Sequence, residues 1–357
     1  MNAWPWAEYS PFAEELHCAT RHLISEPFNV DLPEFLVHLR EVWADGRDIA
    51  YVRRYRGDLA VDPRSGHVFS GRTLLRGSTD IERNRSAEPT PIFARHILRR
   101  GRTFDRIALA HHKFSGNYFH FWNNIAPKAP LLSLAGVPAD VPIVVPKTAV
   151  DVPFFAQALE LGVFGERPII VQGKREVIKA GEIYVAKPFD VDRTLIDATF
   201  DELGLERYPK GDRRIFIARG PKSPNRRFFR NQSDLDALLD EFGIEKVDPQ
   251  DLTLREQIET FSQAAILISA HGAGLTNLLF RRHSPTTVIE LFNPNLQSLH
   301  YALIANAFGH GYFALQNLAA EGRNSVASSE VDLKALREIL ERVIDIGPPK
   351  RQHLATS

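Results

Sequence analysis

The residues best suited to chemistry lie in the sequence AILISAHGAGLTNLLF, residues 265–280. An apolar run ends at Ser269, and small residues then lead into Leu275–Arg281, which has the composition of a helix. The start of a helix offers unpaired backbone N–H groups and a partial positive charge, which favour phosphate. Gly272 and Gly274 would let a phosphate approach the backbone closely because they carry no side chain. The pattern therefore indicates a phosphate site, or alternatively a tight turn whose glycines serve geometry alone.

Other residues of this turn would support a diphosphate. Ala273 is the smallest side chain after glycine, and His271, Thr276 and Asn277 could donate hydrogen bonds to phosphate oxygens.

A basic group follows the apolar run Arg214–Ala218, and its members are Arg219, Lys222, Arg226, Arg227, Arg230 and Asn231. Arginine binds phosphate through two parallel hydrogen bonds. If the run Arg214–Ala218 is a strand beside the one that ends at Ser269, these side chains would reach the same ligand. Arg219 is the strongest candidate because it is closest to the strand end. The alternative is an ordinary solvated basic loop.

Glu290 and His120 are two further candidates for functional residues, and the sequence around each of them is less specific. Glu290 interrupts the apolar run Thr287–Phe292, where a carboxylate is costly unless it is paired or exposed. It could bind ribose hydroxyls, or it could be a paired edge carboxylate. His120 could act as a general base near neutral pH, and Asn124, four residues later on a predicted helix, could hold its ring. The alternative for His120 is a structural role in an aromatic helix.

Three other patterns favour surface roles. Asp190-Val191-Asp192 has the spacing of two metal-binding carboxylates, but it falls in a polar segment and is interpreted as a solvated turn. The pair His111-His112 is expected at the surface. The basic stretch Arg95–Arg106 could attract an anionic lipid-linked acceptor or a membrane surface, although most such runs are solvated.

The elements that must position these residues alternate between strand-like and helical segments, which predicts an α/β fold. Residues 214–292 show a βαβαβ pattern typical of a parallel sheet. The expected domains are residues 1–190, an acceptor-side α/β domain, and residues 191–330, a Rossmann-like nucleotide-sugar domain. A C-terminal helix and tail, residues 331–357, are expected to pack back on the fold.

Composition narrows the class of protein. The chain has 357 residues with 44 basic and 44 acidic side chains, so its formal charge of zero argues against a nucleic-acid-binding protein. Cys18 is the one cysteine, which excludes an intrachain disulfide and a cysteine-based zinc site. Without a secretion signal or an apolar span, we expect a cytoplasmic protein with possible peripheral contact at the inner face of the membrane.

The segment Arg214–Phe292 resembles the glycosyltransferase family 61 domain found in capsular polysaccharide biosynthesis proteins. The similar motifs are IFIAR at 215–219, HGAGLTNLLF at 271–280 and VIEL at 288–291, together with Arg227, Asn231 and a Val247-Asp248-Pro249 helix entry. In the first half, Asn117-Tyr118-Phe119-His120 leading to Pro127-Lys128 is similar to a second motif of the family. The sequence departs from that motif at Phe121, where tryptophan is usual, and at Asn124, where an acidic residue is common.

The resemblance implies a GT-B-like arrangement of two Rossmann-like domains facing a cleft. It implies an inverting glycosyltransferase that takes a sugar from a nucleotide diphosphate sugar, usually a UDP-sugar, without a metal ion or other cofactor. The acceptor would be a saccharide or lipid-linked saccharide in cell-surface polysaccharide synthesis. In these terms the diphosphate would contact residues of the glycine turn and the helix after it: His271, Gly272, Ala273, Gly274, Thr276 and Asn277. Arg219, Arg227 and Asn231 would assist them, Glu290 would hold the ribose, and His120 with Asn124 would be catalytic.

Two rival functions fit parts of the sequence. A hydrolase would use His271-Gly272-Ala273-Gly274 as an oxyanion-hole loop, but such an enzyme also needs a Gly-x-Ser-x-Gly nucleophile turn, which the sequence lacks. A non-catalytic nucleotide-binding or scaffold protein on a decayed transferase fold is the alternative that Phe121 and Asn124 keep open.

Overall fold

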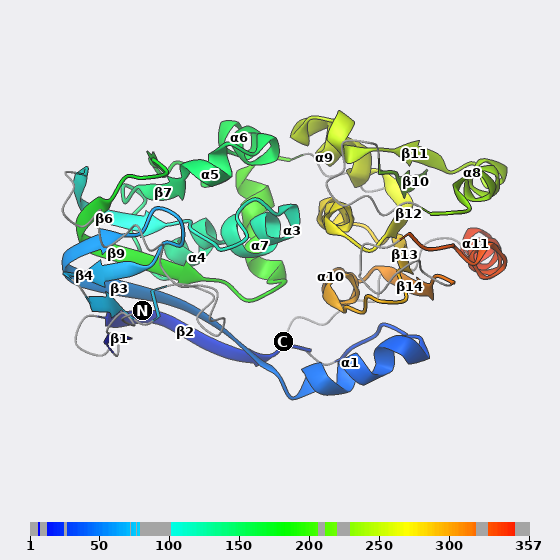
Figure 1. Cartoon of the computed structure of the whole chain (residues 1–357), viewed down its shortest axis with the longest axis horizontal. Helices are drawn as coiled ribbons and strands as arrows, with labels where there is room; N and C mark the ends of the chain where they lie inside the picture. Colours follow the sequence, from blue (N-terminus) through cyan, green and yellow to red (C-terminus); the bar gives the residue numbers. More distant parts are fainter. Residues whose placement is uncertain are drawn as a thin grey trace. The chain divides into compact units, whose positions relative to one another are not determined.

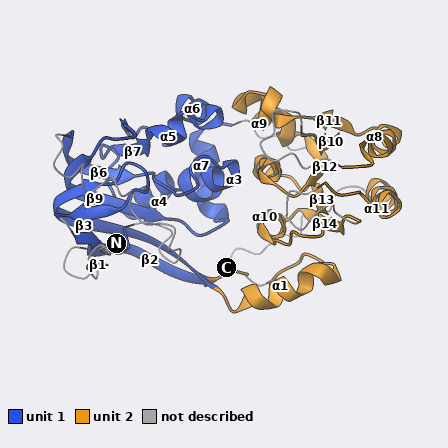
Figure 2. Ribbon diagram, viewed as in Figure 1, with its two compact units in different colours: residues 1–21, 47–205 blue, residues 22–46, 206–357 orange. Residues whose placement is uncertain are grey.

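The computed structural model divides into two compact α/β units (Figure 2). It describes residues 6–7, 13–24, 27–71, 73–75, 77–78, 101–205, 211–219, 229–318 and 328–346. Unit 1 comprises residues 1–21 and 47–205, and unit 2 comprises residues 22–46 and 206–357. The α/β class expected from the sequence is confirmed. The expected boundary was 190/191, and the chain passes into unit 2 at 205/206.

Unit 1 is built on a mixed sheet, which has nine strands among the described residues, in the order β1-β5-β4-β3-β9-β6-β7-β8 with β2 paired to β3. The last four strands of this order run parallel to one another, whereas β3 is antiparallel to both of its neighbours in the order, β9 and β4. The strands are β1 (Trp6–Ala7), β2 (Ala13–His22), β3 (Arg47–Val61), β4 (Val68–Ser70), β5 (Thr73–Leu75), β6 (Thr103–Leu109), β7 (Ile143–Pro146), β8 (Ile169–Gln172) and β9 (Ile178–Lys187).

The helices of unit 1 follow the parallel strands. They are α3 (Tyr118–His120), the π-helix η2 (Phe121–Ile125), α4 (Lys128–Leu134), α5 (Lys147–Val150), α6 (Pro153–Glu160) and α7 (Arg193–Glu202). The predicted helix that carries His120 and Asn124 is therefore a short α-helix followed by a π-helix. The backbone N–H of Ala126 donates to the carbonyl of Phe121 at 2.9 Å, which is the wider π-helical spacing.

Unit 2 contains a sheet of five parallel strands in the order β11-β10-β12-β13-β14, counted over its described residues. These are β10 (Arg213–Ile217), β11 (Glu245–Val247), β12 (Ala264–Ala270), β13 (Thr287–Phe292) and β14 (Gly311–Gln316). The strand order reverses between β10 and β12. In open parallel sheets ligands bind at such a reversal, beyond the carboxyl ends of the strands.

Helices cover both faces of this sheet (Figure 1). On one face α8 (Gln232–Glu241) and α11 (Leu333–Ile346) pack through Leu235, Leu239, Leu336 and Leu340 against Ile268 and Ile289. The expected packing of the C-terminal helix onto the fold is thus confirmed within unit 2. The other helices are α1 (Glu34–Ala44), η3 (Pro249–Asp251), α9 (Leu254–Ser262), the 3₁₀ helix η4 (Ala273–Arg281) and α10 (His300–Phe308).

Local sequence explains most of these boundaries. Thr253 and Glu256 form a capping box at the start of α9, with reciprocal side-chain to backbone hydrogen bonds. Gly309 ends α10 in the left-handed conformation, with φ +72°. Two strands of unit 1 are long: β3 runs for 15 residues and β2 for 10. No helix in the described part of the chain is both long and apolar enough to cross a membrane.

Candidate functional site

The glycine turn lies between β12 and η4, at the reversal of strand order in unit 2. Residues His271–Gly274 are partly exposed, whereas every residue from Leu275 to Arg281 is buried. The helix that the sequence placed at Leu275–Arg281 is a 3₁₀ helix that already begins at Ala273. The first N–H groups of a helix have no acceptor within it, so Ala273 and Gly274 bring such donors to the partly exposed part of the turn.

Each glycine of this turn has a geometric reason. Gly272 adopts φ +157° and ψ 172°, a backbone region that is almost restricted to glycine. A Cβ atom on Gly274 would lie 3.1 Å from Cγ2 of Ile217 in β10, which is tighter than an ordinary contact. Gly274 therefore lets η4 pack closely on the neighbouring strand β10. Gly274 itself belongs to the partly exposed part of the turn.

Arg219 joins the ends of β10 and β12. Its Nη2 atom donates to the carbonyl oxygen of His271 at 2.9 Å and lies 3.5 Å from that of Ala270. The sequence placed Arg219 and His271 near one ligand, and the structure brings them into direct contact. One cationic side chain is therefore fixed beside the glycine turn.

The two other basic-loop candidates have different positions. Arg227 lies outside the described residues. The Asn231 amide forms a pair of hydrogen bonds with Val331, donating to its carbonyl at 2.8 Å and accepting from its N–H at 3.0 Å. Asn231 therefore ties the segment before α11 to the start of α8.

Glu290 is fully buried in the middle of β13, and both of its carboxylate oxygens are engaged. Oε1 lies 2.5 Å from Nδ1 of His271, and Oε2 accepts from the Tyr312 hydroxyl at 2.5 Å. Burial and the nearby charge of Glu290 raise the pKa of Tyr312 well above its ordinary value. The carboxylate that sequence reasoning assigned to ribose thus holds the His271 ring through its Nδ1 atom.

Thr276 and Asn277 are also fully buried. The Thr276 Oγ1 atom has no hydrogen-bond partner among the described residues. The geometry does not bring these two side chains to the exposed edge of the turn, which consists of residues 271–274. Their contact with a diphosphate stays a prediction.

In unit 1, His120 and Asn124 form the predicted pair. Nδ1 of His120 lies 2.9 Å from Oδ1 of Asn124. Asn117 caps this short helix, since its Oδ1 accepts from the backbone N–H of Phe119 at 2.9 Å. The ring of His120 also stacks on His112 and on Phe114, with 4.9 Å between ring centroids in both cases. The His120 side chain is therefore held on several sides.

Of two surface assignments made from sequence, the structure contradicts the one for the histidine pair and agrees with the one for the described part of the basic stretch. His111 and His112 are buried, each with 4% of its surface exposed, because they line the interior next to the helix that carries His120. Of the basic stretch 95–106, residues 95–100 lie outside the described part. Arg102 and Arg106 form ion pairs with Glu176 and Asp140, as expected of a solvated face.

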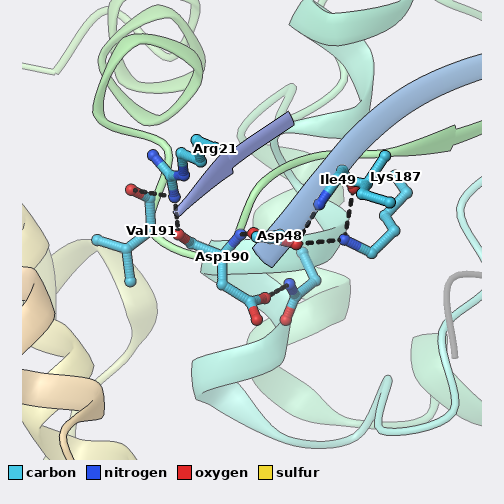
Figure 3. Close-up of polar contacts among 7 residues, drawn as sticks. Arg21, Asp48, Ile49, Lys187, Asp190 and Val191 are labelled. Atoms are coloured by element: carbon cyan, nitrogen blue, oxygen red, sulfur yellow. Dashed lines mark hydrogen bonds and ion pairs between the residues drawn. The ribbon is translucent and has the colours of Figure 1, made fainter. Parts of the chain in front are cut away.

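Asp190 was missed, because the Asp190-Val191-Asp192 sequence was interpreted as a solvated turn. Its carboxyl Oδ1 accepts from Nδ2 of Asn124 at 2.6 Å. Its backbone N–H donates to Asp48 Oδ2 at 2.6 Å (Figure 3). The residue is exposed, yet protein atoms surround its carboxyl group. This desolvation and the charge of Asp48 raise its pKa, and the hydrogen bond from Asn124 opposes the shift.

The second carboxylate of this sequence has a structural role. Asp192 caps α7 by accepting from the backbone N–H of Leu195 at 3.1 Å. Among the described residues no cluster of three or more His, Cys, Asp or Glu side chains has the arrangement of a metal site. Metal independence itself stays a prediction.

The fold and the site define a class of protein: an α/β protein of two units. In unit 2 a glycine turn lies where the parallel sheet reverses its strand order, and Arg219 is hydrogen-bonded to this turn. Comparison with known families specifies it further. Residues 118–289 match the family described as Glycosyltransferase 61. This segment, just under half of the chain, is therefore similar to that family, as the motifs indicated.

One curated relative supports the same assignment. A beta-1,2-xylosyltransferase of Arabidopsis thaliana is 32% identical over 90 residues. The aligned part spans 25% of this chain and 16% of the relative's length. The likeness thus concerns a short segment of each protein.

Proposed function

We propose that this protein is a glycosyltransferase that transfers a sugar from a nucleotide diphosphate sugar to a saccharide acceptor. The observation that carries the proposal is the contact between Arg219 and His271 at the partly exposed glycine turn. The backbone N–H groups that open η4 and the adjacent guanidinium would bind the diphosphate and stabilise its charge as it departs. In this proposal the reaction inverts the anomeric centre and needs no metal ion.

The proposal changes the roles of three predicted residues. Glu290 would not bind ribose. It would hold the His271 ring by the Nδ1 atom, so that Nε2 of His271 could contact the diphosphate. Thr276 and Asn277 would support η4 from inside, because neither is exposed. Arg227 is retained as a donor-binding candidate from sequence alone.

For the acceptor side, we propose that His120 removes the proton from the acceptor hydroxyl. Its ring is held by Asn124 and by aromatic stacking, which is how a general base is kept in a productive orientation. The two units would face each other in a GT-B-like manner. We propose that the protein works in the cytoplasm, on a saccharide or lipid-linked saccharide acceptor in cell-surface polysaccharide synthesis.

A thermal-shift screen tests donor binding. UDP-xylose, named because of the relative's xylosyl transfer, is compared with other UDP-sugars, GDP-sugars and CMP-sugars, with and without EDTA. We expect one UDP-sugar to raise the melting temperature, and the rise to persist with EDTA. A rise that disappears with EDTA would contradict the metal-independent mechanism.

Arg219→Ala should reduce donor affinity about 10- to 100-fold, the range of one charge-assisted hydrogen bond. Isothermal titration with the donor found in the screen measures this change. Arg213→Ala is the matched control: Arg213 is the first residue of β10, at the opposite end of the strand from Arg219, and forms an ion pair with Glu245. Equal donor affinity in wild type and Arg219→Ala would contradict the proposed site. Donor binding without transfer to any oligosaccharide acceptor would favour the non-catalytic alternative.

A further inference from the structure

A continuous polar chain in unit 1 leads from His120 to a carboxylate on a different element. Nδ1 of His120 lies 2.9 Å from Oδ1 of Asn124, and Nδ2 of Asn124 lies 2.6 Å from Oδ1 of Asp190. Asn124 is only 7% exposed, so water does not substitute readily for either partner. His120 and Asn124 come from the α3–η2 segment, whereas Asp190 follows β9.

The carboxylate decides which way the Asn124 amide points. The oxygen and nitrogen of an amide side chain are assigned from their hydrogen bonds. In its ionised form the Asp190 carboxylate only accepts, so the Asn124 NH₂ group then faces Asp190, with Nδ2 at 2.6 Å, and the Asn124 carbonyl oxygen faces His120. A carbonyl oxygen also only accepts, so Nδ1 of His120 must carry a hydrogen. The neutral ring then has its lone pair on Nε2.

The backbone around Asp190 is fixed on several sides (Figure 3). Asp48 accepts from the Asp190 N–H, and the other Asp48 oxygen accepts from Lys187 Nζ at 2.7 Å. Arg21 Nη2 donates to the carbonyl oxygen of Asp190. Val191 has φ +56°, an unusual backbone conformation for a β-branched residue that persists only where surrounding contacts enforce it. The backbone from which the Asp190 side chain projects is therefore held in place, and the hydrogen bond from Asn124 contacts its carboxylate.

We propose that Asp190 is a positioning residue that acts through Asn124 to hold His120 with its Nδ1 protonated, so that Nε2 serves as the base. This inference rests on the proposed transferase function. In the reaction the acceptor hydroxyl proton moves to Nε2 while the hydroxyl oxygen bonds to the anomeric carbon. The bond from that carbon to the diphosphate oxygen breaks, and its electron pair leaves with the diphosphate. The Nδ1–H of His120 keeps its hydrogen bond to Asn124 throughout.

Asp190→Asn removes the charge that orients the amide. Two facing amides can pair in either direction, so His120 should populate both neutral tautomers. We expect kcat to fall about 10- to 100-fold, the range of one charge-assisted hydrogen bond, with the donor KM unchanged. Asp192→Asn is the matched control, because it changes the neighbouring carboxylate of the same turn while asparagine still caps α7.

The exchange variant, which combines Asn124→Asp with Asp190→Asn, separates positioning from a merely structural role. The carboxylate introduced at position 124 would accept directly from the Nδ1–H of His120. The amide introduced at position 190 would donate to that carboxylate, so the same tautomer is restored. We expect this variant to recover most of the lost turnover. Failure of the exchange to recover any turnover would overturn the proposal.

A second readout does not depend on activity. The ¹⁵N chemical shifts of the His120 ring, assigned by comparison with His120→Gln, report which nitrogen is protonated. We expect an Nδ1–H ring in wild type and in the exchange variant, and a mixture in Asp190→Asn. An Nε2–H ring in wild type, or no change in Asp190→Asn, would overturn the inference. If no sugar transfer is found, the proposed function fails, while these shifts still decide the role of Asp190.

Discussion

At the scale of single residues, two histidines are held in the same manner by different partners. Nδ1 of His271 contacts the buried carboxylate of Glu290, whereas Nδ1 of His120 contacts the neutral amide of Asn124. In each case the contact leaves Nε2 as the nitrogen directed to other partners. A carboxylate forms an ion pair once the ring is protonated, which suits a residue that meets a diphosphate. A neutral acceptor suits a ring that must take up and release a proton.

The assignment of His120 as the base gives a prediction at this scale. His120→Gln should lower kcat about 10²- to 10⁴-fold, the range for loss of a general base, and leave donor affinity unchanged. Rates of transfer to an oligosaccharide acceptor and titration with the donor measure the two quantities. Phe119→Leu is a control for packing, since Phe119 is buried beside His120 and carries no titratable group. Turnover equal to wild type in His120→Gln would remove this residue from the mechanism.

Sequence could indicate residue types but not all of their partners. His120 and Asn124 were paired in advance because their spacing is local, four residues along one helical segment. Asp190 was missed because its contact with Asn124 spans 66 positions and depends on where β9 ends. Glu290 was recognised as unusual from its apolar neighbours. Its partners could not be named, because Tyr312 lies on β14, a strand that the sequence did not reveal.

At the scale of elements, the glycine turn depends on the close contact of η4 with β10. Gly274→Ala would place a methyl group 3.1 Å from Ile217 Cγ2, and Ile217 is itself buried. We expect the free energy of unfolding to fall by about 1–3 kcal/mol, as for overpacked cores, and the donor-induced rise in melting temperature to shrink. Gly116→Ala is the control, because its new methyl group would meet Val152 at an ordinary 3.7 Å. Wild-type donor binding in Gly274→Ala would show that the turn tolerates displacement.

Elements with a strong local signal were predicted well. The strands β10, β12 and β13 lie within a few residues of the apolar runs that predicted them, and α11 lies within the expected C-terminal segment. The π-helical turn at Phe121–Ile125 was not expected. Its single wider hydrogen bond depends on the packing of buried residues such as Trp122, which no local pattern reveals.

At the scale of the whole molecule, the chain does not divide at one point. Residues 22–46 belong to unit 2, although the strands on either side of them, β2 and β3, belong to unit 1. Leu36 of α1 is fully buried, and the rings of Phe35 and Phe292 lie 5.5 Å apart. The sequence predicted consecutive domains, whereas unit 2 includes residues 22–46, which lie between two segments of unit 1 in the chain.

A fragment of residues 206–357 should therefore be less stable than unit 2 within the full chain. It would lack α1 and expose the apolar surface that Phe35 and Leu36 cover, which is worth about 1.5–3 kcal/mol for each fully buried large side chain. Urea unfolding followed by circular dichroism measures the difference. Adding a peptide of residues 22–46 should recover part of the stability, whereas the same peptide with Leu36→Asp should not. Equal stability of the fragment with and without α1 would contradict this account.

The strand β13, which α1 contacts, is synthesised long after α1. This order affects folding during synthesis in the cell. Phe35 is translated early, but β13 with Phe292 emerges only after most of the chain has been made. At about 5–20 residues per second, the newly made N-terminal helix would wait on the order of tens of seconds for its strand. During that interval its apolar side chains are open to chaperones on the ribosome, so maturation of this protein should depend on them more than its size alone would suggest.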